Sequence, residues 1–229
     1  MQYLGGKSKT RKQISAYLES VRNGMDYFEP FVGGAWVLQE MSGKRIASDG
    51  NDALITMYKS LQGGWVPPDY VSEAEYQAVR VANNPTDPMT IFCGIGCSFA
   101  GKIWGGYARS ADKNCYAKTS KNSLLKQLPL IKDVDFQYGL FHEHNPENML
   151  VYCDPPYEGT TQYGAFKSFD HTFFWNTMRE WSKKNTVIIS EYKAPEDFKC
   201  VAEFNSQMGM TTGKERPVRV ERLFVYNGI

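Results

Sequence analysis

The strongest constraint on the fold is an alternation of strand and helix patterns within residues 25–62. A strand pattern at 26–28 leads into the glycine turn FVGG and a helical pattern that runs to Met41. KRIAS at 44–48 then reads as a second strand, and NDALITMYKSLQ at 51–62 as a second helix. Strand–helix–strand succession requires a parallel sheet with helices on its faces. The alternation returns at 134–138, 149–153, 170–183 and 186–191, so we predict one α/β fold.

Three further patterns surround this core. A helix is predicted over 8–22, with its apolar positions at helical spacing. The final strand, RVERLFVYN, is predicted to pair in an antiparallel terminal hairpin with residues 201–211. Residues 66–132 interrupt the alternation. They contain helical stretches near 72–82 and 88–97, followed by the glycine-rich basic segment CSFAGKIWGGYAR.

Composition narrows the class of protein. Hydrophobic residues make up 42% of the 229, enough for a substantial core, and no run approaches the roughly 18 apolar residues of a membrane span. The N-terminus, MQYLGGKSKTRKQ, has no apolar signal-peptide core. The five cysteines are odd in number and irregularly spaced, which favours reduced thiols in a cytoplasm. We expect neither a metal site nor a membrane partner.

The net charge of +1 conceals an uneven distribution. Between Ser98 and Lys132, seven basic side chains face one acid, Asp112, so the remainder of the chain is acidic. A basic segment in an acidic chain suggests a surface that faces a polyanion. A solvated, lysine-rich loop and helix would give the same count, so charge alone leaves both readings open.

The glycine turn and Asp49 together suit a nucleoside. Glycines after a strand let backbone amides approach a ligand closely, and an acid at the next strand's end accepts hydrogen bonds from ribose hydroxyls. The turn has neither GxGxxG nor the Lys-Ser/Thr of a phosphate loop. These features predict a ligand without phosphates, although Asp49 could instead cap the helix at 51–62.

The stretch LVYCDPPYEG, residues 150–159, carries the most specific signal. Its apolar half predicts a buried strand, which ends on Asp154, two prolines and Tyr157. Prolines fix φ and have no amide hydrogen, so their carbonyls remain rigidly held acceptors. A carboxylate, a carbonyl and an aromatic ring suit a planar ring that bears an amino group. Since ligands of open parallel sheets bind at the carboxyl ends of strands, we expect Asp154 near Asp49 and the glycine turn.

Four motifs in order give the chain a family resemblance. YLGGK at 3–7, FEPFVGG at 28–34, SDGNDALI at 48–55 and DPPY at 154–157 resemble the Dam-type DNA adenine-N6 methyltransferases, including phage-encoded ones. The resemblance implies a Rossmann-like methyltransferase sheet with helices on both faces and a small, mostly helical target-recognition insertion. The catalytic, cofactor-binding domain would comprise 1–62 and 133–229, with the insertion at 63–132.

The resemblance also implies an S-adenosylmethionine cofactor, a double-stranded DNA substrate and a role for each matching residue. The catalytic group would be Asp154, Pro155 and Tyr157. The residues expected to bind the cofactor are Tyr3, Lys7, Glu29, Phe31, Gly33, Asp49 and Asp154. Ala35 departs from the family, which often has a third glycine there. GKIWGGYAR at 101–109 falls where the family reads its target.

The chemistry follows from the low nucleophilicity of adenine's amino nitrogen, whose lone pair is delocalised into the ring. Asp154 and the Pro155 carbonyl would accept hydrogen bonds from its two hydrogens. They would favour a tetrahedral nitrogen whose lone pair points at the methyl group. The base must first flip out of the duplex. Tyr157 would then stack on it, with Phe169 or Tyr163 nearby.

The basic segment would hold the DNA. Its lysines and arginine would contact phosphates, and Lys102 and Arg109 are candidates for base edges. Several aromatic residues also have a purely structural interpretation. Phe169 and Trp175 could pack in the core, and Trp104 could either pack beneath the insertion or insert into DNA. His171 suits a helix start.

Other activities stay open from the sequence. The chain could methylate cytosine N4, RNA adenine or a protein, or it could be a nucleic-acid-binding protein without activity. Enzymes that methylate cytosine N4 resemble this chain less, because they more often carry Ser or Thr at the position of Asp154. An intact DPPY argues against an inactive protein.

Overall fold

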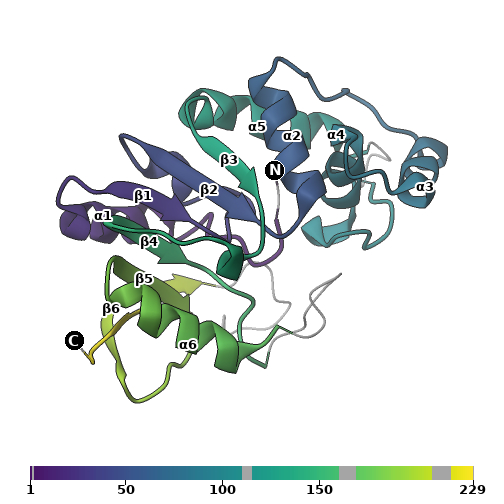
Figure 1. Cartoon of the computed structure of the whole chain (residues 1–229). Coiled ribbons are helices and arrows are strands. Elements are labelled where there is room, and N and C mark those ends of the chain that lie inside the picture. Colours follow the sequence, from purple (N-terminus) through teal and green to yellow (C-terminus); the bar gives the residue numbers. More distant parts are fainter. Residues whose placement is uncertain (2, 110–114, 160–168, 208–217, 229) are drawn as a thin grey trace.

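The computed structural model describes residues 1, 3–109, 115–159, 169–207 and 218–228 (Figure 1). Within them, a seven-stranded sheet has the order β3-β2-β1-β4-β5-β7-β6. Strands β1, β2, β3, β4 and β5 are mutually parallel, whereas β7 runs antiparallel to both β5 and β6. The strands are β1 (Asp26–Glu29), β2 (Arg45–Asp49), β3 (Asp135–Tyr138), β4 (Met149–Cys153), β5 (Thr186–Glu191), β6 (Phe198–Gln207) and β7 (Val218–Tyr226).

Six α-helices and several short turns accompany the described strands. The α-helices are α1 (Arg11–Arg22), α2 (Asp52–Gln62), α3 (Glu73–Ala82), α4 (Pro88–Ile91), α5 (Ala117–Ile131) and α6 (His171–Ser182). The short turns are η1 (Leu38–Glu40), η2 (Phe92–Gly96, a π-helical turn that continues α4), η3 (Phe99–Gly101) and η4 (Phe141–Glu143). The predicted Rossmann-like α/β class and terminal hairpin are confirmed.

Helices cover both faces of the sheet because successive strand residues point to opposite sides. In β4, Leu150 and Tyr152 pack into the core cluster that contains α1 and α2. Val151 and Cys153 pack instead with the aromatic side chains of α6. Figure 1 shows α6 beneath the β4–β5 region, with α2 and α5 at the other side of the molecule.

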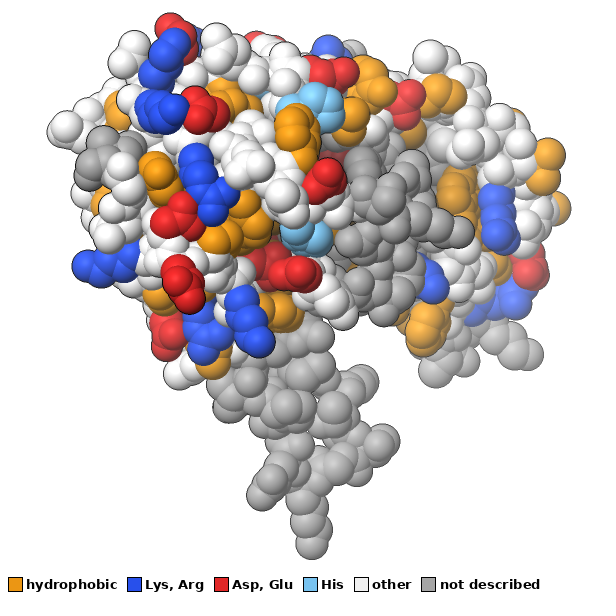
Figure 2. Space-filling view, turned by 60° about the horizontal axis from the view of Figure 1, so that its bottom comes forward, with side chains coloured by type: hydrophobic (Ala, Val, Ile, Leu, Met, Phe, Trp, Pro, Cys, Tyr) orange, Lys and Arg blue, Asp and Glu red, His pale blue; other side chains and the backbone are white. Residues whose placement is uncertain are grey.

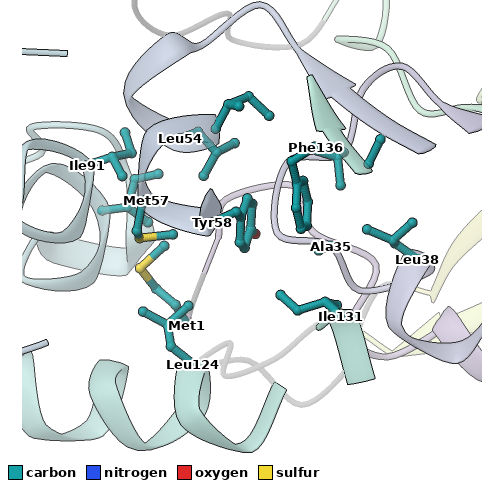
Figure 3. Packing of buried hydrophobic residues seen from close by; sticks show 14 of the residues in the cluster. Met1, Ala35, Leu38, Leu54, Met57, Tyr58, Ile91, Leu124, Ile131 and Phe136 are labelled. Atoms are coloured by element: carbon teal, nitrogen blue, oxygen red, sulfur yellow. The ribbon is translucent and has the colours of Figure 1, made fainter. Parts of the chain in front are cut away.

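The larger core joins the sheet to α2 and α5. Tyr58 of α2 stacks on Phe136 of β3, with ring centroids 4.7 Å apart (Figure 3). Leu124 and Ile131 of α5 lie in the same cluster, so α5 packs against the same core as α2. The division of the chain into a catalytic domain and a 63–132 insertion stays a proposal.

The prediction of a helix directly after the glycine turn is wrong. Residues 30–37 form turns, and only η1 follows before β2. The spacing of apolar residues in FVGGAWVLQEM is helical, but Gly33 has φ 45° and Ala35 φ 53°. Both lie in the left-handed region, which interrupts a right-handed helix.

Two neighbours on α6 test how this face is packed. Phe174 is 0% exposed among α6, β4 and β5, whereas Phe173 is 45% exposed. Phe174→Ala should lower the free energy of unfolding by about 3–5 kcal/mol, because it empties a closed core site. Phe173→Ala should change it by no more than about 1 kcal/mol. Urea unfolding measures both, and equal losses would contradict this packing.

Candidate active site

One edge of the sheet gathers acidic side chains from adjacent strands. Asp49 ends β2, Glu29 ends β1, Asp154 follows the last residue of β4, and Glu191 ends β5. These strands are neighbours in the order β2-β1-β4-β5, and all four run parallel, so their carboxyl ends meet at this edge. Glu221 of β7 adds a fifth carboxylate, next to Arg222, which is paired in register with Glu191.

Lys7 lies among these acids. Its Nζ is 2.6 Å from Asp154 Oδ1 and 3.6 Å from Glu221 Oε1. The lysine side chain is 9% exposed and that of Asp154 19%, so the ion pair is largely shielded from water. Among the residues that the structure describes, Lys7 is the cation that forms ion pairs with this group of acids.

Tyr157 is held on several sides. Its hydroxyl donates a hydrogen bond to Glu221 Oε1, and Lys7 Nζ lies 4.5 Å from the centre of its ring. The ring of Tyr192 meets it edge-on, with centroids 4.7 Å apart. Tyr157 is therefore largely buried and held in one orientation.

Glu191 fixes the backbone that follows Tyr157. One carboxylate oxygen accepts a hydrogen bond from the Glu158 amide at 3.1 Å, and the other accepts from the Tyr192 amide at 2.7 Å. The carboxylate thus ties the DPPY loop to the end of β5. Glu191 is not among the predicted site residues, although it ends the strand TVIISE, and the end of a strand is the signal that identifies Asp49 and Asp154.

The glycine turn is held from three directions. The Gly33 amide donates to Asp49 Oδ2 at 3.0 Å, while the Gly33 carbonyl accepts from the Tyr58 hydroxyl of α2 at 2.8 Å. Gln127 of α5 donates to the carbonyls of Gly34 and Ala35. A turn this tightly tied keeps one backbone conformation before any ligand binds.

The N-terminal motif packs directly on this turn. A Cβ added to Gly33 would lie 3.1 Å from Tyr3 Cε1, and one added to Gly34 would lie 2.8 Å from Trp36 Nε1. Ala35 occupies the left-handed conformation, at a cost of roughly 1–2 kcal/mol that glycine would avoid. The position where the family often has glycine is thus a position where this chain holds alanine under strain.

Burial disfavours charge on this edge. It raises the pKa of Glu29 well above its ordinary value, against the opposing hydrogen bond from Tyr27. It raises the pKa of Asp49 and of Asp154 to about 6, in the second case against the lowering effect of Lys7, and that of Glu191 to about 7. Several buried carboxylates beside one ammonium favour a ligand that brings positive charge.

Most of the predicted site residues lie at this edge or on its glycine turn. They are Tyr3, Lys7, Glu29, Gly33, Asp49, Asp154 and Tyr157. Asp49 does not cap α2, because the Asn51 side chain accepts from the Leu54 amide and is the cap. Asp49 accepts from the Asn51 amide instead. Tyr163 lies outside the described residues.

Phe31 and Phe169 take part in an aromatic cluster. Their centroids are 6.0 Å apart, and both rings contact Phe141 and Phe174. Trp175 is buried against Phe198. The core interpretation of Phe169 and Trp175 therefore fits the structure better than stacking on a base. His171 is the first residue of α6, as predicted.

Lys102 and Arg109 lie at exposed positions of the inserted loop. Arg109 pairs with Glu73 of α3 and lies over the Tyr107 ring. Trp104 packs against Gly94 and meets the Tyr76 ring edge-on, which favours packing over insertion into DNA. The loop still touches the site, because the Leu4 amide donates to the Gly101 carbonyl at 3.3 Å.

Acidic side chains from elsewhere in the fold neutralise part of the basic excess between Ser98 and Lys132. Besides the Arg109–Glu73 pair, Lys121 Nζ lies 3.2 Å from Asp69 Oδ1. On the face shown in Figure 2, basic and acidic side chains of the described residues are interspersed. The described part of the chain contains no group of three or more His, Cys, Asp or Glu residues that could hold a metal ion. None of its helices is long and apolar enough to cross a membrane.

Comparison with known families gives a specific match. Residues 3–86 match the model of the D12 class N6 adenine-specific DNA methyltransferase family. The family resemblance predicted from the four motifs is thereby confirmed. The matched range contains Tyr3, Lys7, Glu29, Gly33 and Asp49. It ends before the DPPY motif, and no curated protein matches the chain.

Solved structures resemble the chain at low identity. A protein from Thermoplasma acidophilum is 8% identical, with a TM-score of 0.42 over 95% of this chain and 87% of its own. The rRNA methyltransferase aviRa from Streptomyces viridochromogenes is 11% identical, with a TM-score of 0.40 over 95% and 84%. A precorrin-6y C5,15-methyltransferase from Geobacter metallireducens is 9% identical, with a TM-score of 0.39 over 95% and 87%.

A pair of glycines tests the packing of the turn. Gly34→Ala places a methyl group against Trp36 and Tyr3, so it should displace the turn and lower the free energy of unfolding by about 1–3 kcal/mol. Gly5→Ala meets no atom within 4 Å and tests only the positive φ of 80°. Thermal unfolding of both variants checks this, and a Gly34→Ala protein as stable as wild type would contradict the close contact.

Proposed function

We propose that this chain transfers a methyl group from S-adenosylmethionine to the N6 amino group of adenine in duplex DNA. The observation that carries the proposal is the 2.6 Å ion pair between Lys7 and Asp154. Lys7 belongs to the matched segment 3–86, whereas Asp154 opens the DPPY motif beyond it. The fold thus joins the two motifs on which the proposed chemistry depends.

The acidic edge fits the proposed cofactor. S-adenosylmethionine supplies an electrophilic methyl group on a positively charged sulfonium. Asp49, held by two backbone amides, keeps further lone pairs for ribose hydroxyls. The buried carboxylates of Glu29 and Asp154 favour a cationic group nearby, and the glycine turn has no lysine for a phosphate. We propose that Tyr3, Lys7, Glu29, Phe31, Gly33 and Asp49 bind the cofactor.

Asp154 is the proposed catalytic acceptor. Its carboxylate and the Pro155 carbonyl would accept hydrogen bonds from the two amino hydrogens and stabilise positive charge that grows on the nitrogen. As the nitrogen–methyl bond forms, the sulfur–methyl bond would break and S-adenosylhomocysteine would leave, and the methylated nitrogen would then lose one proton to Asp154 or to water. The base reaches them after flipping from the duplex, at an unstacking cost of about a few kcal/mol. Tyr157 would contact the flipped ring, and Lys102 and Arg109 would contact the DNA, Arg109 after release from Glu73.

The decisive test is incubation with S-adenosylmethionine and unmethylated genomic DNA, followed by mass spectrometry of the digested nucleosides. We expect 6-methyladenine from the wild type, and a rate at least about 100-fold lower for Asp154→Asn, which loses the carboxylate. Asp133→Asn is the matched control, because Asp133 is exposed in the turn before β3. 4-Methylcytosine would overturn the choice of base, and cofactor binding without a modified base would point to RNA or protein.

The pKa of Asp154 predicts the pH dependence. Burial raises that pKa to about 6, and the proposed role requires the ionised form. The value of kcat/KM for S-adenosylmethionine should therefore rise with pH through about 6. Lys7 lowers the pKa of Asp154, so Lys7→Gln should move this rise to higher pH as well as slow the reaction. A profile flat from pH 5 to 8 in the wild type would contradict the assignment.

A further inference from the structure

Glu221 is an acid at this edge that lies outside the four motifs and outside the parallel strands. It lies on β7, in the terminal hairpin, 64 residues from Tyr157 in sequence, and is 9% exposed. A buried carboxylate that binds nothing is strongly unfavourable, so its contacts indicate why it is there. Those contacts are the Tyr157 hydroxyl and the Lys7 ammonium.

We propose that Glu221 is a positioning residue, whose carboxylate sets the orientation of Tyr157 and holds Lys7 against Asp154. This inference rests on the proposed methyl transfer. It adds a role for the terminal hairpin, because the hairpin would then act in the site as well as complete the sheet.

The geometry assigns two functions to one carboxylate. The Tyr157 ring can rotate about its side-chain bonds, and a hydrogen bond from its hydroxyl to Glu221 removes that freedom. Tyr192 limits the ring from a second direction. A fixed ring contacts a flipped base without first being ordered, and positional errors near 1 Å can reduce a rate about 100-fold.

The second function is electrostatic. Lys7 Nζ lies between Asp154 and Glu221, and both carboxylates raise the pKa of the lysine. Glu221 also raises the pKa of Asp154 by repulsion. The other titratable groups that face this set come from several elements. They are Tyr3 of the N-terminal segment, Glu29 of β1, Tyr152 and Cys153 of β4, Tyr157 of the DPPY loop, and Glu191 and Tyr192 at the end of β5.

A double-mutant cycle tests the first function. Glu221→Ala and Tyr157→Phe both remove the hydrogen bond that these two residues share, and each should lower kcat, by about 10- to 100-fold for Glu221→Ala. Tyr157→Phe also removes the hydrogen bond of its hydroxyl to Asp154, so the two losses should be less than additive if Glu221 acts through that hydroxyl. Additive losses would overturn the inference. Glu203→Gln, in which only the exposed pair with Arg222 is lost, is the matched control and should keep wild-type kcat.

A pH profile tests the second function. Glu221→Gln keeps an oxygen that can accept from Tyr157 but removes the negative charge, so the pKa of Asp154 should fall. The rise in kcat/KM should therefore move to lower pH, opposite to the shift expected for Lys7→Gln. A purely structural role would leave this rise in place, and an unmoved profile would overturn the electrostatic assignment.

The outcomes separate this inference from the proposed function. If the wild type forms 6-methyladenine and Glu221→Ala retains its kcat, the inference fails alone. If the wild type forms no methylated base, the proposed function fails and the inference with it. Thermal unfolding and S-adenosylmethionine binding by calorimetry establish that each variant is folded. If Glu221→Ala does not fold, Tyr157→Phe decides by itself, and unchanged kcat and pH profile in that variant overturn the inference.

Discussion

The arrangement of the site depends on one electrostatic constraint: carboxylates from five adjacent strands share an edge with Lys7. Each strand contributes one acid, from Asp49 of β2 to Glu221 of β7. Removing so many carboxylates from water is costly, and the raised pKa values of Asp49, Asp154 and Glu191 express that cost. The edge therefore favours a cation, and the protein supplies only part of that charge through Lys7.

The backbone next to this edge is fixed by side chains from elsewhere in the fold. Tyr58 of α2 and Gln127 of α5 bind three successive carbonyls of the glycine turn, while Asp49 binds an amide. Gly33 and Ala35 are both left-handed, so the turn belongs to no regular helix, and these side-chain contacts hold its carbonyls and its amide in place. Helices that flank the sheet thus serve the site as well as the core.

How much could be predicted from the sequence depends on whether a contact follows from parallel pairing. Asp49 and Asp154 were predictable, because parallel strands that end in acids place those acids together. Glu191 follows the same rule, because it ends β5. Glu221 could not be found this way, since its position depends on the register between antiparallel β7 and β5. The helix expected after the glycine turn failed because apolar spacing does not report φ, and Gly33 and Ala35 are both left-handed.

Separation in sequence has a further consequence for the site. Lys7 and Asp154 are 147 residues apart, and Glu221 lies beyond both, so their contacts form only when the N-terminal segment, β4 and the terminal hairpin are all in place. No local segment can preorganise this charge arrangement. Burial of Asp154 disfavours its charged form, and Lys7 offsets part of that cost only when the segment that carries it is in place. Site electrostatics and completion of the fold are therefore coupled, and substitutions at Lys7 or Glu221 act on both.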